Sequence, residues 1–281
     1  MRLGRFKIEH LSEGRFESYL DGSFQKMDYR STQSTKSPPV FVEKTSASIG
    51  IDPILIQGED ANILLETGLG WGLDHNSRNH KVSNLKTNLE IFGLTPRDIT
   101  HVILSHLHYD HAAGSTFNDE ELKTRPTMPN ASYFVQKREW EFALNSLEQK
   151  QQVQGAGYQL DELYRLVADN RFYFIDEDYL KILPGIEVIW SGGHTPGHQI
   201  VRISDQHKVA YYMGDLVPSD AHLNHYSMRH IDLNPEQARQ MKMVLLRQAY
   251  KEDAFLLFYH SLYTKYGKLS KDRHRKYVLQ D

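Results

Sequence analysis

Histidines and aspartates of this chain follow short apolar runs that are rich in β-branched residues. The clearest example is the run over residues 101–105 (HVILS), which leads directly into residues 106–111 (HLHYDH). Apolar β-branched runs of this length predict buried strands. Open α/β sheets build their sites just beyond the carboxyl ends of such strands. The pattern therefore predicts strands that alternate with helices and carry their chemistry at one edge of a sheet.

The rest of the chain repeats this alternation of strands and helices. The predicted strands cover residues 5–19 with a turn at 12–14, then 52–57, 62–66, 101–105, 131–136, 186–190, 199–203, 208–213 and 254–259. The predicted helices cover residues 85–92, 95–98, 137–152, 160–167 and 234–249. A single α/β domain over residues 1–281 is the expected organisation.

Composition limits the kind of metal site that the chain can build. It has 15 histidines and no cysteine, so thiol nucleophiles, iron–sulfur clusters and cysteine-based zinc fingers are excluded. A transition metal would have to bind through imidazole and carboxylate groups.

The charge balance limits the partners. There are 33 Lys and Arg residues against 36 Asp and Glu residues, so no overall field favours nucleic acid or an anionic membrane. The basic residues between 265 and 276 are expected to form a solvated tail. No apolar run has the length of a signal peptide or a membrane-spanning helix. We therefore expect a cytoplasmic protein that acts on a small molecule.

Residues 106–111 have the spacing of a metal-binding motif. His106 and His108 project to the same side of an extended chain, so both can reach one metal. Asp110 and His111 follow them and could serve a second metal. The alternative is a polar surface loop that is rich in histidine by chance. A chance match to this motif is rare, so the metal site is favoured.

Three later residues extend the cluster. His194 follows two glycines that allow a sharp turn, whereas Asp215 and His260 end two predicted strands. Taken singly, Asp215 also fits a turn aspartate and His260 a capped core histidine. We expect Asp215 to bridge two metals, since Asp110 already has a partner in His111. His198 is expected to orient or cap its turn and not to bind metal.

The order of these residues resembles that of the metallo-β-lactamase-fold hydrolases over roughly residues 50–262. The resemblance implies an αββα sandwich, in which two mixed sheets are flanked by helices and the metals lie at one edge. It implies two divalent cations, most simply Zn²⁺. One would be held by His106, His108 and His194, the other by Asp110, His111 and His260, and Asp215 would bridge both.

Within that superfamily the chain is most similar to quorum-quenching N-acyl-homoserine lactone lactonases. The similarity is carried by residues 52–56 (DPILI), 105–112 (SHLHYDHA) and 258–260 (FYH). It implies a metal-dependent hydrolase in which a metal-bridged hydroxide opens a lactone or ester. Asp110 would take up the proton and deliver it to the leaving alkoxide. A homodimer is compatible with the resemblance.

Other activities of the same fold remain open at this point. They are a thioesterase of the glyoxalase II type, an aryl-ester hydrolase and an organophosphate hydrolase. A diiron redox protein is disfavoured because that branch usually carries glutamate where His108 stands. A non-catalytic binding module is disfavoured because all seven ligand positions are filled.

Two positions depart from the lactonase pattern. Glu66 stands where the family usually has aspartate before Thr-Gly, and is expected to orient nearby backbone in the same way. Pro218 stands where lactonases place a tyrosine that assists the substrate carbonyl, so His222 or Tyr226 is expected to replace it. Residues 31–48, as a candidate pocket lid, and residues 218–230 are the expected walls of the substrate pocket.

Overall fold

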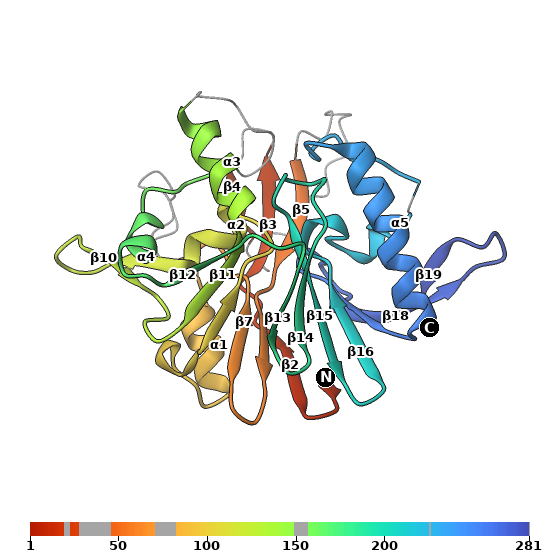
Figure 1. Cartoon of the computed structure of the whole chain (residues 1–281), viewed down its shortest axis with the longest axis horizontal. Helices are drawn as coiled ribbons and strands as arrows, with labels where there is room; N and C mark the ends of the chain where they lie inside the picture. The colour runs from red at the N-terminus through yellow and green to blue at the C-terminus, as the bar shows by residue number, and fades with distance from the viewer. Residues whose placement is uncertain (20–22, 28–45, 71–82, 149–156, 225, 281) are drawn as a thin grey trace, which may run out of the picture.

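Two seven-stranded sheets lie face to face and carry helices on their outer sides (Figure 1). The structure is a computed structural model, and it describes residues 1–19, 23–27, 46–70, 83–148, 157–224 and 226–280. Helices α1 (Leu85–Ile91), α3 (Lys137–Glu148) and α4 (Tyr164–Ala168) lie on the left in Figure 1, and α5 (Pro235–Lys251) lies on the right. This arrangement confirms the predicted αββα sandwich.

The first sheet is mixed. Its strands in spatial order are β1 (Arg2–Leu3), β2 (Phe6–His10), β6 (Ile54–Gln57), β7 (Asn62–Leu65), β8 (His101–Ile103), β11 (Ser132–Gln136) and β12 (Phe172–Ile175). The pairs from β1 to β7 are antiparallel and include the predicted hairpin β6–β7. The pairs from β7 to β12 are parallel, so the carboxyl ends of β7, β8 and β11 meet at one edge.

The second sheet is also mixed. Its strands in spatial order are β13 (Tyr179–Leu183), β14 (Ile186–Trp190), β15 (Gln199–Asp205), β16 (Lys208–Tyr212), β17 (Phe255–Leu257), β18 (Tyr266–Lys271) and β19 (Tyr277–Leu279). Only β16 and β17 pair in parallel, and α5 lies between them in sequence. The carboxyl ends of β16 and β17 therefore meet at the same edge.

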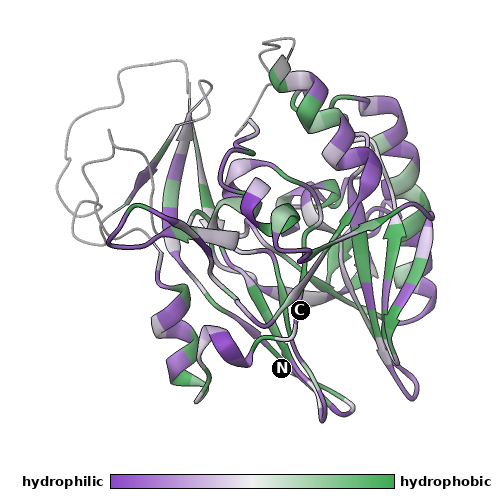
Figure 2. Cartoon of the chain, turned by 60° about the vertical axis from the view of Figure 1, so that its left-hand side comes forward, coloured by the Kyte–Doolittle hydropathy of each residue, from purple (hydrophilic) through white to green (hydrophobic). Residues whose placement is uncertain are grey.

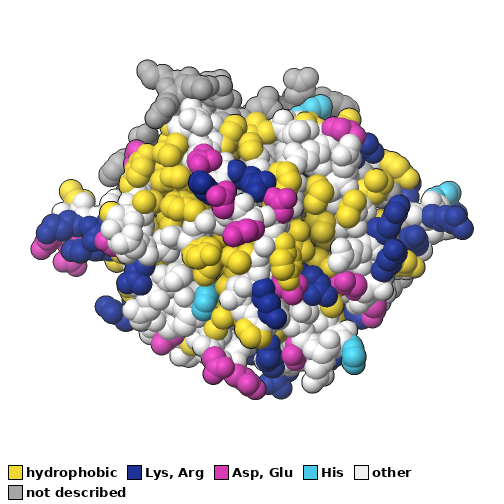
Figure 3. Space-filling model, viewed as in Figure 1, with side chains coloured by type: hydrophobic (Ala, Val, Ile, Leu, Met, Phe, Trp, Pro, Cys, Tyr) yellow, Lys and Arg dark blue, Asp and Glu magenta, His cyan; other side chains and the backbone are white. Residues whose placement is uncertain are grey.

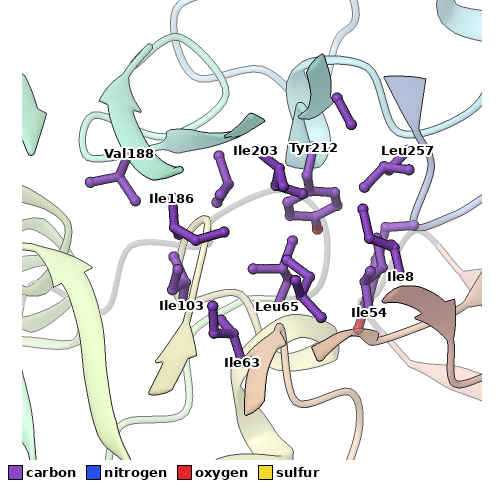
Figure 4. Packing of buried hydrophobic residues seen from close by; sticks show 14 of the residues in the cluster. Ile8, Ile54, Ile63, Leu65, Ile103, Ile186, Val188, Ile203, Tyr212 and Leu257 are labelled. Atoms are coloured by element: carbon purple, nitrogen blue, oxygen red, sulfur yellow. The ribbon is translucent and has the colours of Figure 1, made fainter. Parts of the chain in front are cut away.

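Alternation of side chains along the strands builds the core between the sheets (Figure 4). Ile63 and Leu65 of β7 point inward and meet Ile203 and Tyr212 of the second sheet, whereas Leu64 belongs to the outer cluster of the first sheet. The strands are apolar on both faces because each sheet is covered on both sides.

Each outer face is closed by helices whose apolar side faces the sheet. Leu85 and Leu89 of α1 are buried against the first sheet, and Leu245 and Leu246 of α5 against the second. Figure 2 shows the resulting hydrophilic and hydrophobic faces of these helices. None of the described helices is both long and apolar enough to span a membrane.

A three-stranded sheet and a two-stranded hairpin complete the described structure. The former contains β3 (Gly14–Tyr19), β4 (Phe24–Lys26) and β5 (Ser46–Ile51), and the latter contains β9 (Thr116–Asn118) and β10 (Thr124–Pro126). Most of the candidate lid at 31–48 lies outside the described residues, and residues 46–48 begin β5.

One expectation about the C-terminal part was wrong. The strand predicted at 254–259 is not the final one, and the basic residues at 265–276 do not form a solvated tail. They form β18 and the turn into β19, which extend the second sheet. Lys265 pairs with the buried Asp52 carboxylate at 2.6 Å, whereas the basic residues from 271 to 276 are exposed. Leu269 and the following Tyr277 are buried in the cluster that contains α5, an alternation that the charge count hides.

Candidate metal centre

The seven predicted ligands come from four separate loops at one edge of the sandwich. His106 and His108 follow β8, and Asp110 and His111 lie in the short helix α2 (Tyr109–Ala112). His194 follows β14. Asp215 lies in the 3₁₀ turn η4 (Gly214–Leu216) after β16, and His260 follows β17. The structure therefore brings together all seven residues that the strand-end pattern selects, and each is at most 8% exposed.

Three imidazoles form the first group of donors. The Nδ1 atom of His108 lies 3.0 Å from Nε2 of His106 and 3.2 Å from Nε2 of His194. The Oδ2 atom of Asp215 lies 3.5 Å from Nε2 of His194. These ring nitrogens and this oxygen converge on one point.

The second group lies on the other side of Asp215. Nε2 of His111 and Nε2 of His260 are 3.1 Å apart. Oδ1 of Asp215 lies 3.4 Å from Nε2 of His111 and 3.3 Å from Nε2 of His260. Oδ2 of Asp110 lies 3.4 Å from Nε2 of His260. Each Asp215 oxygen thus faces a different group.

These spacings fit metal coordination. Ligand atoms placed about 2.0–2.1 Å from a tetrahedral zinc ion lie roughly 3.3 Å from one another. Oδ1 of Asp215 is buried and has no hydrogen-bond partner among the described residues, as expected of an atom that faces a cation. An imidazole and carboxylate donor set also suits a borderline divalent metal. The residues therefore fit two cations with Asp215 between them.

Burial and neighbouring charge shift the pKa values of the imidazoles in different directions. Burial, reinforced by the neighbouring imidazoles, holds the pKa of His106 and that of His108 well below the usual value. Burial also disfavours the charged form of His111, but the carboxylates of Asp110 and Glu66 outweigh it and raise the His111 pKa. Neutral imidazoles are the form that binds metal.

Outer partners fix the orientation of several rings. Nδ1 of His194 lies 2.9 Å from Oδ1 of Asp232, and the guanidinium of Arg229 contacts the same carboxylate at 2.5 Å. Nδ1 of His260 lies 2.8 Å from the carbonyl oxygen of Gly50. Sequence reasoning missed Asp232 and Arg229, because they lie in an irregular segment with no motif around them.

Glu66 and His198, which we expected to orient nearby backbone, do so in the structure. The carboxylate of Glu66 accepts hydrogen bonds from the Ser105 amide and the Tyr212 hydroxyl, both at 2.9 Å, and so fixes the end of β8. Nε2 of His198 accepts a hydrogen bond from the backbone amide of Asp215 at 3.1 Å. His198 holds the turn that carries Asp215 and lies outside the groups of converging donors.

The two residues proposed to replace the family tyrosine lie in different places. His222 is partly buried in the 3₁₀ turn η5 (Asp220–His222), and burial with the nearby Arg229 charge lowers its pKa to about 4. Asp220 of the same turn accepts a hydrogen bond from the Ser261 hydroxyl at 2.7 Å, which ties η5 to the segment after His260. Tyr226 is 65% exposed and lines a surface hollow that contains none of the seven ligands.

Comparisons with a family model and with known proteins agree on the family to which the chain is similar. A family model described as the metallo-beta-lactamase superfamily matches residues 50–273. An N-acyl homoserine lactonase of Bacillus cereus is 25% identical over 166 residues, which is 54% of this chain and 57% of the relative. One from a Bacillus species is 25% identical over 64% of this chain and 66% of the relative. The chain thus spans less than two thirds of these relatives.

Solved structures match more of the chain. A probable metal-dependent hydrolase from Staphylococcus aureus is 27% identical, with a TM-score of 0.77 over 100% of this chain and 99% of the other. A dizinc quorum-quenching lactonase in complex with a product is 20% identical, with a TM-score of 0.72 over 100% and 96% of the two chains. The latter likeness concerns the fold.

Proposed function

The chain belongs to the metallo-beta-lactamase superfamily, and we propose from this premise that it is a metal-dependent hydrolase that opens the ring of an N-acyl-homoserine lactone. The observation that carries the proposal is the convergence of five histidines and two aspartates, whose donor atoms form three overlapping groups. The lactonases among its relatives support the substrate class. The proposed ligands are His106, His108 and His194 for one cation, Asp110, His111 and His260 for the other, and Asp215 for both.

The protein's own residues would bind the cations and orient the imidazole ligands. Divalent cations, when bound, supply an activated water at neutral pH and polarise the substrate carbonyl. Asp232 and Gly50 hold the outer nitrogens of His194 and His260, so their other nitrogens stay directed at the site. This fixed geometry avoids reorganisation during the reaction.

Asp110 is the proposed proton carrier. Its Oδ2 lies 3.4 Å from Nε2 of His260, and its side chain is only 8% exposed. The carboxylate therefore lies beside both imidazoles of the second group of donors. In ester hydrolysis a carboxylate in this place takes a proton from the attacking water and returns it to the leaving alkoxide.

His222 is the proposed hydrogen-bond donor to the substrate carbonyl. Its Nδ1 lies 2.7 Å from the Ser219 hydroxyl, and the lowered pKa keeps the ring neutral at pH 7. When the Ser219 hydroxyl donates to Nδ1, the ring proton is on Nε2. The turn that carries His222 is tied through Asp220 to Ser261, the residue after His260, whereas Tyr226 lines a hollow away from the ligands.

The test of the activity is a substrate panel on zinc-loaded protein. We expect hydrolysis of N-hexanoyl-homoserine lactone with a kcat/KM at least tenfold above that for a glutathione thioester, an aryl ester and a phosphotriester. Activity should disappear on chelation and return with zinc. A fully loaded protein that leaves the lactone intact, or prefers the thioester, would contradict the proposed substrate.

The donor is tested by a pair of variants. His222→Leu should lower kcat for the lactone by about 10²-fold, the usual effect of losing one carbonyl-oxygen donor. Metal content should stay at the wild-type level, and Tyr226→Phe is the matched control that should keep kcat. If Tyr226→Phe lowers kcat and His222→Leu does not, Tyr226 is the donor.

A further inference from the structure

A hollow of about 530 Å³ opens between the end of α5 and the β18–β19 hairpin, and it shares no residue with the metal centre. Four cations line it: Arg247 and Lys251 from α5, Lys271 from the end of β18 and Arg275 from the following turn. Figure 3 shows Lys and Arg side chains gathered over this region on the right of the molecule. The lining contains no carboxylate.

The four cations of the hollow differ from those surface cations that have a carboxylate partner. Lys137, Arg165 and Arg239 each form a salt bridge with a carboxylate, at 3.0, 2.9 and 2.6 Å. Among the described residues no salt bridge forms to any of the four cations of the hollow. Like charges that line one hollow repel one another, so the hollow favours an anion.

The acids next to these cations in sequence are already engaged. Glu252 accepts a hydrogen bond from the Tyr211 hydroxyl at 2.8 Å. Asp272 accepts hydrogen bonds from the amides of His274 and Lys276 at 2.9 and 2.8 Å. The helix dipole explains a basic residue in the last turn of α5, such as Lys251. It does not explain Lys271 and Arg275, which come from another element.

Aromatic rings stand beside the cations. Tyr250 and Tyr277 line the hollow with their ring centroids 5.7 Å apart, and Tyr250 is 40% exposed. The Lys271 ammonium lies 4.9 Å from the centroid of the Tyr250 ring. Arginine binds phosphate with two parallel hydrogen bonds, and tyrosine stacks on flat heterocycles.

We propose that this hollow binds a small phosphorylated ligand with a flat ring, of the size of a nucleoside diphosphate. The adjacent cations and tyrosines match the two halves of such a molecule. The volume lies within the roughly 300–1,000 Å³ of small-molecule sites. A small ligand is favoured over a nucleic acid, since the hollow is of small-molecule size and the chain has a net charge of −3.

The experiment is calorimetric titration of the zinc-loaded protein with adenosine diphosphate, inorganic phosphate, adenosine and a twelve-nucleotide single strand. We expect saturable binding of the diphosphate in the micromolar range, at least tenfold tighter than phosphate or adenosine, and weakened by salt. Equal affinity for phosphate would overturn the flat-ring half of the proposal. If the twelve-nucleotide single strand binds tenfold tighter than the diphosphate, the proposal that the ligand is a small molecule is wrong.

Variants separate this hollow from the metal centre, which could itself attract phosphate. A double variant with Arg247→Gln and Arg275→Gln should weaken diphosphate binding at least tenfold and leave lactone hydrolysis unchanged. Arg239→Gln on the same helix is the matched control and should bind normally. Asp215→Asn should still bind the diphosphate; loss of binding there, with normal binding by the double variant, would overturn the site.

Tyr250→Leu tests the ring contact separately. It should weaken binding of the diphosphate but not of inorganic phosphate, and equal weakening of both would contradict stacking. Circular dichroism should show an unchanged fold in each variant, which the exposed positions of Tyr250, Arg247 and Arg275 favour. This proposal does not depend on the proposed lactonase activity, since its readout is binding.

Discussion

Three imidazoles of the metal centre present one nitrogen to the other donors and hold the second nitrogen on a fixed partner. The partners are the Asp232 carboxylate for His194, the Ser105 hydroxyl for His106 and the Gly50 carbonyl for His260. Such partners fix the tautomer and the direction of the metal-binding nitrogen. The quality of this centre therefore depends on residues that lie outside the ligand motif.

Asp232→Asn tests that dependence. Asparagine keeps the shape of the side chain but removes the charge that faces His194 and Arg229. Zinc affinity, measured by competition with a chelator, should fall by roughly 10–100-fold. Glu236→Gln, an exposed carboxylate a few residues away, is the control and should keep the wild-type affinity. Unchanged affinity in Asp232→Asn would show that this carboxylate does not support the ligand.

The buried carboxyl group of Glu13 should make the stability of the protein depend on pH. Burial raises its pKa from 4.5 to about 7, against hydrogen bonds from Ser83 and the Leu69 amide. Between pH 4.5 and pH 7 the native state then binds more protons than the unfolded state, so stability is present at low pH and is lost as pH rises.

Urea unfolding should show this loss directly. Over that pH range the free energy of unfolding should fall by roughly 3 kcal/mol relative to Glu13→Gln. Glu121→Gln, on an exposed carboxylate, should keep the wild-type dependence. A wild-type curve parallel to that of Glu13→Gln would contradict the assignment.

At the scale of elements, the glycine turn after β14 joins the metal centre to α5. Gly193 has a φ of +84°, and a Cβ there would lie 2.5 Å from the backbone nitrogen of Ala238 in α5. The amide of Asn234, the N-cap of α5, donates to the Gly193 carbonyl at 2.8 Å. The start of α5 therefore packs directly on the turn that presents His194.

Gly193→Ala should therefore damage both stability and metal binding. Gly93→Ala is the matched control, because Gly93 has a φ of +72° but no atom within 4 Å of its added Cβ. The control should cost only the backbone strain of about 1–2 kcal/mol. Gly193→Ala should cost more and should also lower zinc affinity. Thermal unfolding and zinc titration measure the difference, and equal losses in both variants would contradict the packing argument.

At the scale of the molecule, the metal centre joins the two sheets. Residues after β8 of the first sheet and after β14, β16 and β17 of the second supply its donors. A cation bound between them stabilises only the folded chain, because the unfolded chain does not bring these donors together.

Metal removal should therefore lower the melting temperature. Zinc at about 1,000 times its Kd adds about 4 kcal/mol per site, which corresponds to a rise of about 7 °C per site for a chain of 281 residues. Calorimetry of chelated and zinc-loaded protein measures the shift. The Asp215→Asn variant should show a smaller shift in melting temperature. If the chelated wild-type protein melts at the same temperature as the zinc-loaded protein, the proposed metal site is contradicted.

The sequence alone determined the alternation of strands and helices and the residues that gather at the edge, and its family resemblance implied the αββα sandwich. Periodicity marks apolar strands, and a strand has one carboxyl end, so His106, Asp215 and His260 had to follow strand ends. Only the tertiary structure decided what lies around them. The Asp232 carboxylate reaches His194 across 38 residues of sequence, and the cationic hollow joins α5 to the β18–β19 hairpin. No local periodicity encodes such contacts between side chains of separate elements.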